Sequence, residues 1–349
     1  FKQKTAYEIG VRLVGSEMCI RDSIGGALKI LFADKFPEAQ LQQLQDQGHE
    51  CDLQPDLDGD TLPQAVNDAE VLVVRSTKIT SDTIGAAASL RLIIRAGAGT
   101  NTIDKDAAAD RGIPVCNIPG KNAVAVAELA MGLLIAIDRR IPENVIDLRA
   151  GRWNKKKYSV AQGLMGRHMG IIGLGAIGLA VAERARAFGI HVYVVDKPDR
   201  SAQTRETLAG LGLQTVPDLD SMLNVCDIIS LHVPSAAETK GMVDAEFVAK
   251  LQPGAILINA SRGDVIDETA LLAAMNEKGI RAGLDVYADE PSAGEGAFSS
   301  ALASHPNTCG THHIGASTDQ AQKAVSDGVL EVIEAFVGGT VMNCVNGQG

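Results

Sequence analysis

Residues 168–178 read His-Met-Gly-Ile-Ile-Gly-Leu-Gly-Ala-Ile-Gly, and an alanine-rich stretch then leads to Val194-Val195-Asp196. The apolar residues 169–172 predict a buried strand, and residues 176–188 have the composition of a helix. A second apolar run, 192–195, predicts the next strand. The glycines therefore lie between a strand and a helix, which is the context in which a Gly-x-Gly-x-x-Gly motif is informative.

Each glycine of this loop has a physical role. Gly173 permits the tight turn, Gly175 lets a pyrophosphate approach the backbone, and Gly178 allows the helix to pack on the strand. Free N–H groups at the helix start bind phosphates. Asp196 is placed to accept hydrogen bonds from a ribose diol, and its charge repels a 2′-phosphate. The loop predicts NAD rather than NADP, although basic residues at 197 and 200 weaken the discrimination. A glycine-rich turn in an ordinary βαβ unit is the alternative.

Length and composition limit the class of protein. A chain of 349 residues suggests two domains, because single cores stop growing near ~250–300 residues. Hydrophobic residues make up 46% and aromatic residues only 3%, which suits aliphatic parallel strands under helices. A net charge of −11 without a Lys/Arg stripe argues against nucleic acid as a partner. No apolar run reaches the ~18 residues of a membrane span.

The six cysteines, at positions 19, 51, 116, 226, 309 and 344, have no Cys-x-x-Cys spacing. Several lie in apolar contexts that resemble strands. This pattern favours buried free thiols over disulfides or metal ligands. The sequence therefore predicts a cytoplasmic protein without a metal site.

Residues 1–23 do not fit the pattern of the remaining chain. They lack the uninterrupted apolar stretch of a signal peptide and the periodicity of an amphipathic helix. They resemble translated sequencing-adapter read-through, so we treat them as a non-native leader and exclude them from the fold prediction. A natural disordered leader is the alternative. Deleting these residues is expected to leave activity unchanged.

From Ala27 onward, predicted strands alternate with predicted helices. Strands are expected at 28–32, 69–74, 90–94 and 114–116, and helices at 38–47 and 106–110. Further strands are expected at 228–233, 255–259, 282–286 and 308–310. Such alternation implies parallel sheets. The six strands from 169 to 310 fill one doubly wound nucleotide domain.

The fold class is therefore α/β with two doubly wound domains. A Rossmann-type domain, 121–314, is inserted into a flavodoxin-like domain made of 24–120 and 315–349. The last segment begins with a hydroxyl-capped helix start at Ser317-Thr318 and has apolar residues at helical spacing up to Gly338-Gly339. This helix is expected to return to the first domain.

Residues 122–139 are apolar nearly all round. A helix of this kind is buried on every side, so it predicts either a seam between domains or an oligomer interface. Pro142 is expected to start another helix that ends at Gly151. A basic run, 152–157, follows and contains the only tryptophan.

Three segments that follow late strands carry groups able to do chemistry: 259–267, 284–291 and 312–318. Ligands of open α/β sheets bind outside the carboxyl ends of the strands. An arginine, a glutamate and a histidine from these segments could therefore converge on one point. Each alone has an ordinary alternative: a surface ion pair, a turn residue or a satisfied structural histidine.

With the glycine loop, these segments resemble the D-isomer-specific 2-hydroxyacid dehydrogenases. The resemblance is closest to the short-type phosphoglycerate dehydrogenases, which lack an appended regulatory domain, and it runs from Ala27 to Asn346. Its strongest pieces are Arg75-Ser76, Arg95-Ala96-Gly97-x-Gly99, Ala127-Glu128-Leu129, Gly151-x-Trp153, Arg262-Gly263, Asp285-Val286-Tyr287, Glu290-Pro291 and Gly315-Ala316-Ser317-Thr318.

The resemblance implies three catalytic residues. His313 is the general acid and base, since an ordinary histidine titrates near ~6.5 and can transfer a proton in both directions. Glu290 bonds the other ring nitrogen and fixes its tautomer, with Asp289 as an alternative carboxylate. Arg262 clamps the substrate carboxylate. This chain has His312 where the family usually has proline, so a second imidazole could perturb or partly replace the first. The Gly-Ala-Ser-Thr register favours His313.

The resemblance also implies ligand-binding residues. Those for the cofactor are Gly173, Gly175, Ala176, Ile177, Gly178, Asp196, His232, Val233, Pro234, Ala260 and Asp285. Those for the substrate are Arg75, Gly97, Ala98, Gly99 and Arg262. Asp285 would accept from the nicotinamide carboxamide. The small residues 97–99 would form a nest of N–H donors for the substrate carboxylate. Arg75 matches the position that binds the phosphate end of phosphoglycerate.

The expected activity is NAD-dependent oxidation of D-3-phosphoglycerate to 3-phosphohydroxypyruvate, the entry to serine synthesis. The expected partner is a small, phosphorylated 2-hydroxy or 2-keto acid, and the expected assembly is a homodimer or homotetramer. Two alternatives stay open. One is a glyoxylate/hydroxypyruvate reductase or another D-2-hydroxyacid dehydrogenase, and the other is an NAD-sensing binding protein that resembles a corepressor.

Overall fold

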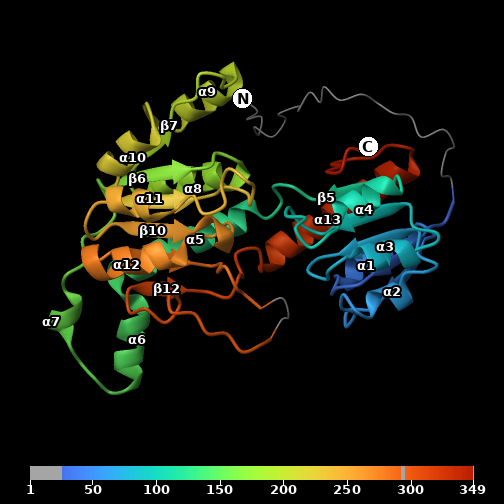
Figure 1. Ribbon diagram of the computed structural model, residues 1–349, viewed down its shortest axis with the longest axis horizontal. Helices are drawn as coiled ribbons and strands as arrows, with labels where there is room; N and C mark the ends of the chain where they lie inside the picture. Colours follow the sequence, from blue (N-terminus) through green and yellow to red (C-terminus); the bar gives the residue numbers. More distant parts are fainter. Residues whose placement is uncertain (1–25, 292–294, 349) are drawn as a thin grey trace, which may run out of the picture. The chain divides into compact units, whose positions relative to one another are not determined.

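The computed structural model describes residues 26–291 and 295–348, so the predicted leader, 1–23, lies outside the described residues. The chain divides into two compact units (Figure 1). Of the described residues, unit 1 takes those up to Ala96, Thr100–Asn117 and those from Asp327 onward. Unit 2 takes Gly97–Gly99 and Ile118–Ser326. The sequence places the two crossings near 121 and 315, whereas the chain passes between the units after Asn117 and after Ser326.

Unit 1 is built on a five-stranded parallel sheet of order β2-β1-β3-β4-β5. This is the flavodoxin-like order, as predicted. The central strand β3 is buried at every residue, as expected for a strand covered on both faces. The strands are β1 (Lys29–Phe32), β2 (Glu50–Leu53), β3 (Val71–Val74), β4 (Leu92–Arg95) and β5 (Val115–Asn117).

The helices of unit 1 lie between these strands. They are α1 (Glu38–Asp46), α2 (Leu62–Ala65), α3 (Ser81–Ala86), α4 (Lys105–Asp110) and the second half of α13 (Asp319–Val337). Thr318 caps α13, because its hydroxyl accepts a hydrogen bond from the Ala321 N–H at 3.1 Å. The predicted hydroxyl cap is therefore present.

Unit 2 is built on a seven-stranded parallel sheet of order β12-β11-β10-β9-β6-β7-β8. The strand order reverses between β6 and β9, which is the switch point where open α/β sheets bind ligands. The doubly wound prediction is confirmed, with one strand more than the six expected. The strands are β6 (His168–Ile172), β7 (His191–Val195), β8 (Gln214–Val216), β9 (Ile228–Leu231), β10 (Ile256–Asn259), β11 (Arg281–Leu284) and β12 (Thr308–Gly310).

The long helix α5 (Ala123–Arg139) is buried within unit 2. It packs against α8 (Ala176–Ala187) and against β10, β11 and β12. Leu133, Leu134 and Ile137 belong to the same apolar cluster as strands β6 and β7. The prediction of a seam between domains or an oligomer interface therefore needs correction, because most of the apolar surface of this helix covers its own sheet. The other helices of unit 2 are α9 (Ala202–Gly210), α10 (Leu219–Val225), α11 (Ala245–Lys250), the 3-10 turn η1 (Gly263–Val265) and α12 (Glu268–Lys278).

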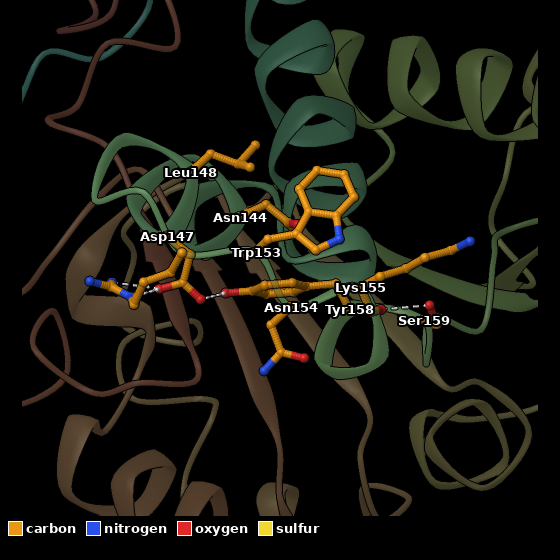
Figure 2. Close-up of a pocket in the computed structure, with 9 residues that line it drawn as sticks. Asn144, Asp147, Leu148, Trp153, Asn154, Lys155, Tyr158 and Ser159 are labelled. Atoms are coloured by element: carbon orange, nitrogen blue, oxygen red, sulfur yellow. Dashed lines mark hydrogen bonds and ion pairs between the residues drawn. The ribbon is translucent and has the colours of Figure 1, made fainter.

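Two helices, α6 (Ile141–Arg149) and α7 (Lys155–Tyr158), extend from the body of unit 2 as an arm (Figure 1). Neither helix has a buried residue. Large apolar side chains on the arm face solvent, including Ile146 at 61% and Trp153 at 81% of full exposure. Figure 2 shows Trp153 and Leu148 beside a hollow of about 260 Å³ on this arm.

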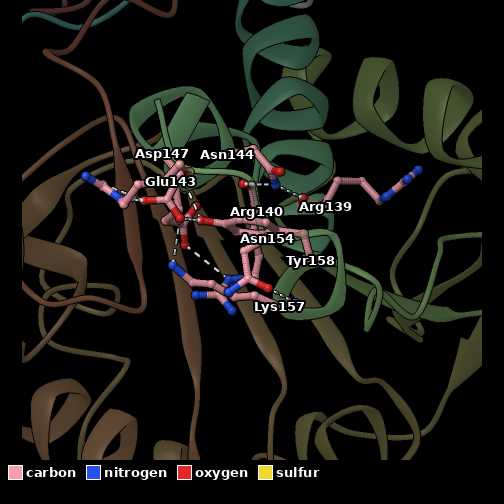
Figure 3. A network of polar contacts seen from close by, with 9 residues as sticks. Arg139, Arg140, Glu143, Asn144, Asp147, Asn154, Lys157 and Tyr158 are labelled. Atoms are coloured by element: carbon pink, nitrogen blue, oxygen red, sulfur yellow. Dashed lines mark hydrogen bonds and ion pairs between the residues drawn. The ribbon is translucent and has the colours of Figure 1, made fainter. Parts of the chain in front are cut away.

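A polar network rather than a core holds the arm together. The Asp147 carboxylate accepts hydrogen bonds from Tyr158 at 2.6 Å, Arg152 at 2.6 Å and Lys157 at 3.1 Å (Figure 3). These donors, Tyr158 first, keep the pKa of Asp147 well below its usual range. The Arg140 guanidinium also lies over the ring of Tyr158. The arm therefore presents its apolar side chains from an ordered hairpin.

No helix within residues 26–291 and 295–348 combines the length and the apolar character needed to cross a bilayer.

Candidate active site

The glycine loop lies between β6 and α8 and has the shape that its sequence predicts. Gly173 has φ +97°, and a Cβ there would collide with the backbone carbonyl of His232. A Cβ on Gly175 would meet no atom within 4 Å, so this face of the loop is open to an approaching group. Gly175 also caps α8 without using any side chain, which leaves the first N–H groups of the helix free for an anion. These residues fit the pyrophosphate of a dinucleotide.

Asp196 follows the end of β7, and its side chain is 46% exposed. Two cations lie beside its carboxylate: Arg200 Nη1 at 3.9 Å and Arg205 Nη1 at 4.0 Å. Sequence proximity pointed to residues 197 and 200 but not to Arg205, which α9 brings back. The position predicted to bind the ribose therefore combines one carboxylate with two guanidinium groups.

Arg262 lies in the loop after β10 and is held by two contacts. The buried Asn259 donates from Nδ2 to the Arg262 carbonyl at 2.8 Å, and its Oδ1 accepts from Ser261 N and Oγ. Arg262 Nη1 donates to the Ser261 carbonyl at 2.6 Å. A Cβ on Gly99 would collide with the Arg262 guanidinium, so a larger residue there would push the end of that side chain aside. The structure thus brings two of the predicted substrate-binding residues, Arg262 and Gly99, side by side.

Asp285 lies just after β11 and is 1% exposed. Its Oδ1 accepts from Thr311 Oγ1 at 2.7 Å and from Ile314 N at 2.8 Å, and its Oδ2 accepts from Gly315 N at 2.8 Å. Its backbone carbonyl accepts from His313 N at 2.7 Å. Asp285 therefore ties together the loop after β12, a role that its predicted contact with the cofactor did not include.

His313 is carried by this same loop. Its Nδ1 lies 2.6 Å from Glu290 Oε1, so the histidine and the glutamate meet as the resemblance implies. The second carboxylate oxygen of Glu290 accepts from Tyr287 N at 3.4 Å, which anchors it beside β11. His312 is exposed, and its ring makes no hydrogen bond or ion pair among the described residues. The geometry therefore favours His313 over His312 as the partner of Glu290.

The backbone of His313 has φ +54°, the left-handed region that few residues other than glycine and asparagine adopt. The hydrogen bonds of Asp285 to residues on both sides of His313 impose this conformation. Strained backbone of this kind persists only where the surroundings determine it, and it is frequent in active sites.

The remaining predicted substrate residues lie in two places. Gly97 belongs to unit 2, and its carbonyl accepts from Ile118 N at 2.9 Å. Arg75 belongs to unit 1 and follows β3. There the Asp34 carboxylate accepts from the backbone N–H groups of residues 75–77, at 2.6–3.1 Å. The Arg75 guanidinium itself has no hydrogen bond or ion pair within the part of the chain that the structure describes, so it can bind an anion.

His232 follows β9 and packs against the glycine loop. Its Nε2 lies 2.8 Å from Ser230 Oγ, and its Nδ1 has no hydrogen-bond partner among the described residues. Burial lowers the pKa of His232 to about 4. The imidazole is therefore neutral at physiological pH. The neighbouring predicted cofactor residues Val233, Pro234 and Ala260 also lie at carboxyl ends of strands, after β9 and β10.

This buried histidine makes stability depend on pH in a defined window. Between pH 6.5 and about 4 the unfolded chain binds a proton that the folded chain excludes, so stability falls as the pH falls through this window. We expect a loss of about 3 kcal/mol from this residue, since each tenfold change in proton affinity is worth ~1.4 kcal/mol. Urea unfolding of wild type and His232→Gln across this range measures it. Equal pH dependence of the two proteins would contradict this role.

The part of the chain that carries these site residues matches a known protein family. The family model described as "D-isomer specific 2-hydroxyacid dehydrogenase, NAD binding domain" matches residues 131–315. The chain belongs to this family. The match begins inside α5 and ends at Gly315, so it includes the glycine loop, Arg262, Glu290 and His313. A nicotinamide dinucleotide is therefore the cofactor for which unit 2 is built.

The relatives that this chain resembles are named for different enzymatic activities. The D-3-phosphoglycerate dehydrogenase of Methanocaldococcus jannaschii is 38% identical over 322 residues, which are 91% of this chain and 59% of the relative. The chain thus spans about three-fifths of that relative's length. The hydroxypyruvate reductase of Thermotoga maritima is 41% identical over 281 residues, 79% of this chain and 88% of the relative.

Experimental structures show the same fold. The NADPH-dependent glyoxylate/hydroxypyruvate reductase of Sinorhizobium meliloti, in complex with NADP and malonate, superposes with a TM-score of 0.77. The two sequences are 31% identical, and the superposition covers 93% of this chain and 98% of that one. The family is common to these relatives, whereas the named substrates are not.

Proposed function

We propose that this protein oxidises D-3-phosphoglycerate to 3-phosphohydroxypyruvate with NAD, the step that opens serine synthesis. The single observation that carries an enzymatic role is the 2.6 Å contact between His313 and Glu290 on loops that follow neighbouring strands. The pair disfavours a pure binding protein, because such a protein transfers no proton. The phosphorylated substrate is supported by the guanidinium of Arg75, which is unpaired among the described residues, and by the relatives named D-3-phosphoglycerate dehydrogenase.

In the proposed mechanism, bound NAD supplies the hydride acceptor. Because Nδ1 of His313 is engaged by Glu290, Nε2 is the nitrogen left to take the proton of the substrate hydroxyl. The carboxylate stabilises the imidazolium that results and holds the ring in one orientation. In the reverse direction the same nitrogen returns the proton to the carbonyl oxygen.

Arg262 and the glycine nest would hold the substrate carboxylate. A guanidinium donates two parallel hydrogen bonds to a carboxylate, and small residues at 97–99 let the anion approach backbone N–H groups. The tether from Asn259 limits the movement of the Arg262 backbone. The substrate would thus be oriented before the proton leaves its hydroxyl.

NAD is proposed over NADP because the Asp196 carboxylate would repel a 2′-phosphate. The two arginines beside it oppose this preference, since both could pair with that phosphate. Initial rates with each cofactor at several concentrations decide between them, and a higher kcat/KM with NADP would overturn the assignment.

Replacing Arg75 with alanine tests the phosphate assignment. A lost charge-assisted hydrogen bond of about 1.5–3 kcal/mol predicts that KM for 3-phosphohydroxypyruvate rises about 10–100-fold. KM for hydroxypyruvate should change little, because that substrate has no phosphate. Steady-state reduction of both substrates by wild type and variant measures the difference, and Arg91→Ala, which alters a surface ion pair of the same unit, is the matched control. Equal increases for both substrates would remove the phosphate assignment.

A second candidate is a glyoxylate or hydroxypyruvate reductase. It is favoured by the 41% identity to the Thermotoga maritima enzyme and by the Sinorhizobium meliloti structure. A panel of phosphorylated and unphosphorylated 2-hydroxy and 2-keto acids, followed by absorbance of the reduced cofactor, separates the candidates. Binding of NAD without turnover of any substrate would instead favour a sensor.

We also propose a homodimer or homotetramer in which the α6–α7 arm contacts a second copy of the chain. The arm is basic, with seven Arg/Lys and two carboxylates in residues 139–157, on a chain of net charge −11. It therefore complements the rest of an identical molecule in charge, and its exposed Ile146 and Trp153 supply apolar area to bury.

The variant Ile146→Glu is expected to shift the assembly toward the 36.6 kDa monomer, since it places a charge at the apolar contact. Sedimentation velocity or light scattering over a range of concentrations measures the mass. Leu53→Glu, at an exposed apolar position on β2 of unit 1, should leave the mass unchanged. A monomeric wild type would end the proposal.

A further inference from the structure

A second chemical feature, separate from the proposed reaction, lies in unit 1 at the C-terminal tail. Residues 343–346 run antiparallel to β5 and bind its backbone. Asn117 N donates to the Asn343 carbonyl at 3.2 Å, and Val345 N donates to the Val115 carbonyl at 2.8 Å. The Asn346 side chain accepts from Val115 N at 3.0 Å. The tail thus extends the edge of the sheet beyond β5.

This pairing places two cysteines opposite each other. Cys116 and Cys344 form an antiparallel β-bridge. The hydrogen bonds join the residues that flank them, so the cysteines are a non-hydrogen-bonded pair, for which Cα atoms lie roughly 4.5 Å apart and side chains share one face. Disulfides need Cα separations of about 4.4–6.8 Å. The backbone is therefore already within the range of a disulfide.

Other cysteines of the described chain lack this arrangement. In the sheets, Cys51 is in register with Ile30, and Cys309 is in register with Gly283. Both thiols of the pair are free in the structure. Strand register therefore places Cys116 opposite another cysteine, Cys344, whereas Cys51 and Cys309 face other residue types.

The two thiols differ in accessibility. Cys116 is buried, and burial together with the nearby Cys344 raises its pKa to about 12. Cys344 is partly exposed, and its Sγ donates to Asn346 Oδ1 at 3.2 Å. An oxidant from solution therefore reaches Cys344 first, and Cys116 is the thiol that resolves the product.

We propose that Cys116 and Cys344 are a redox modification site, which a peroxide converts to a disulfide that fastens the C-terminal tail to β5. The Cys344 sulfur attacks one peroxide oxygen, the O–O bond breaks, and a sulfenic acid and one water result. The Cys116 sulfur then loses its proton and attacks the Cys344 sulfur, which forms the S–S bond and releases a second water. Two thiols lose two electrons, and the peroxide is reduced to two waters.

The link would join distant parts of the sequence. Cys116 lies next to the residue at which the chain leaves unit 1, and Cys344 follows the return at Asp327. The closed ring therefore includes all of Ile118–Ser326, and long rings restrict the unfolded chain most. Oxidation is expected to raise the thermal midpoint of unfolding and to protect the tail from proteolysis.

Peptide mapping of the whole protein tests the site. The protein is treated with hydrogen peroxide under native conditions, remaining thiols are alkylated, and the digest is analysed by mass spectrometry without reduction. The expected result is a linked peptide pair containing Cys116 and Cys344, lighter by two hydrogen atoms and separated by dithiothreitol. The same treatment in denaturant should scatter the links among other cysteines.

Variants give an independent readout. The rise in thermal midpoint on oxidation should vanish in Cys344→Ala, which changes only the tail and avoids the buried strand. It should persist in Cys309→Ala, the matched control from unit 2. Separate alkylation of both thiols after peroxide treatment, or oxidation of Cys344 to a sulfinic acid without the linked peptide, would overturn the proposal.

Discussion

Replacing His313 with asparagine is expected to lower kcat by about 10²–10⁴-fold, the usual contribution of a positioned general acid or base. Asparagine adopts positive φ more readily than most residues, so it fits the φ of +54° and removes the imidazole with little added backbone strain. The unfolding midpoint should therefore stay close to that of wild type. Steady-state oxidation and reduction rates measure the loss.

The neighbouring His312→Asn is the matched control, because this histidine is exposed and its ring makes no hydrogen bond or ion pair among the described residues. It should keep kcat within about threefold of wild type, as expected for a residue outside the proton path. Glu290→Gln should fall between the two, since the amide can still accept from the ring but no longer stabilises its positive charge. Equal losses in His312→Asn and His313→Asn would contradict the assignment of His313.

Replacing Asp285 with asparagine is expected to cost about 2–3 kcal/mol of folding free energy and to lower kcat about 10²-fold. Oδ1 accepts from Ile314 N and Oδ2 accepts from Gly315 N. Whichever way an asparagine is turned, its amide NH₂ faces one of these N–H groups. The loop must shift to relieve this clash, and it carries His313 with it.

The control for Asp285→Asn is Thr311→Val, which removes a single donor from Oδ1 and leaves both backbone bonds in place. It should lose about 1 kcal/mol and keep most of kcat, which is the ordinary worth of one hydrogen bond. Urea unfolding and steady-state kinetics measure both quantities. If Asp285→Asn only raised KM for NAD, with stability and kcat unchanged, its carboxylate would serve the cofactor rather than the loop.

Much of the fold could be predicted from local pattern. The glycine loop predicted its strand and helix, because turn, phosphate approach and packing each require glycine at a fixed spacing. Strand β3 is a continuous apolar run, and β9 and β10 are apolar except for Ser230 and Asn259, as expected for strands buried on both faces.

Edge elements escaped prediction for a physical reason. Strand β2 reads Glu-Cys-Asp-Leu and β8 reads Gln-Thr-Val, and both are mostly exposed. An edge strand gains its pairing from a neighbour and needs little apolar character of its own. Helices α2 and α3 were missed because they are four and six residues long, too short to show periodicity.

The residues of the candidate site could be predicted from the sequence, but their hydrogen-bond partners could not. The family resemblance implied Arg262, Glu290 and His313, and the Gly-Ala-Ser-Thr register favoured His313 over His312. Only the structure shows that Nδ1 is the ring nitrogen that meets Glu290. The contacts of Asp285 with Ile314 and Gly315 involve backbone N–H groups, which leave no trace in the sequence. The sequence also could not show what α5 packs against, because an apolar helix has the same residue pattern whether it covers its own sheet or a neighbouring unit.

The division into two units has a consequence for the evolution of the protein. The groups assigned to proton transfer and to the carboxylate all belong to unit 2, whereas Arg75, assigned to the far end of the substrate, belongs to unit 1. Mutations in unit 1 could therefore change which 2-hydroxy acid is preferred as substrate without altering the groups assigned to proton transfer. Such modularity would let one ancestral chemistry diversify into enzymes with different metabolic tasks.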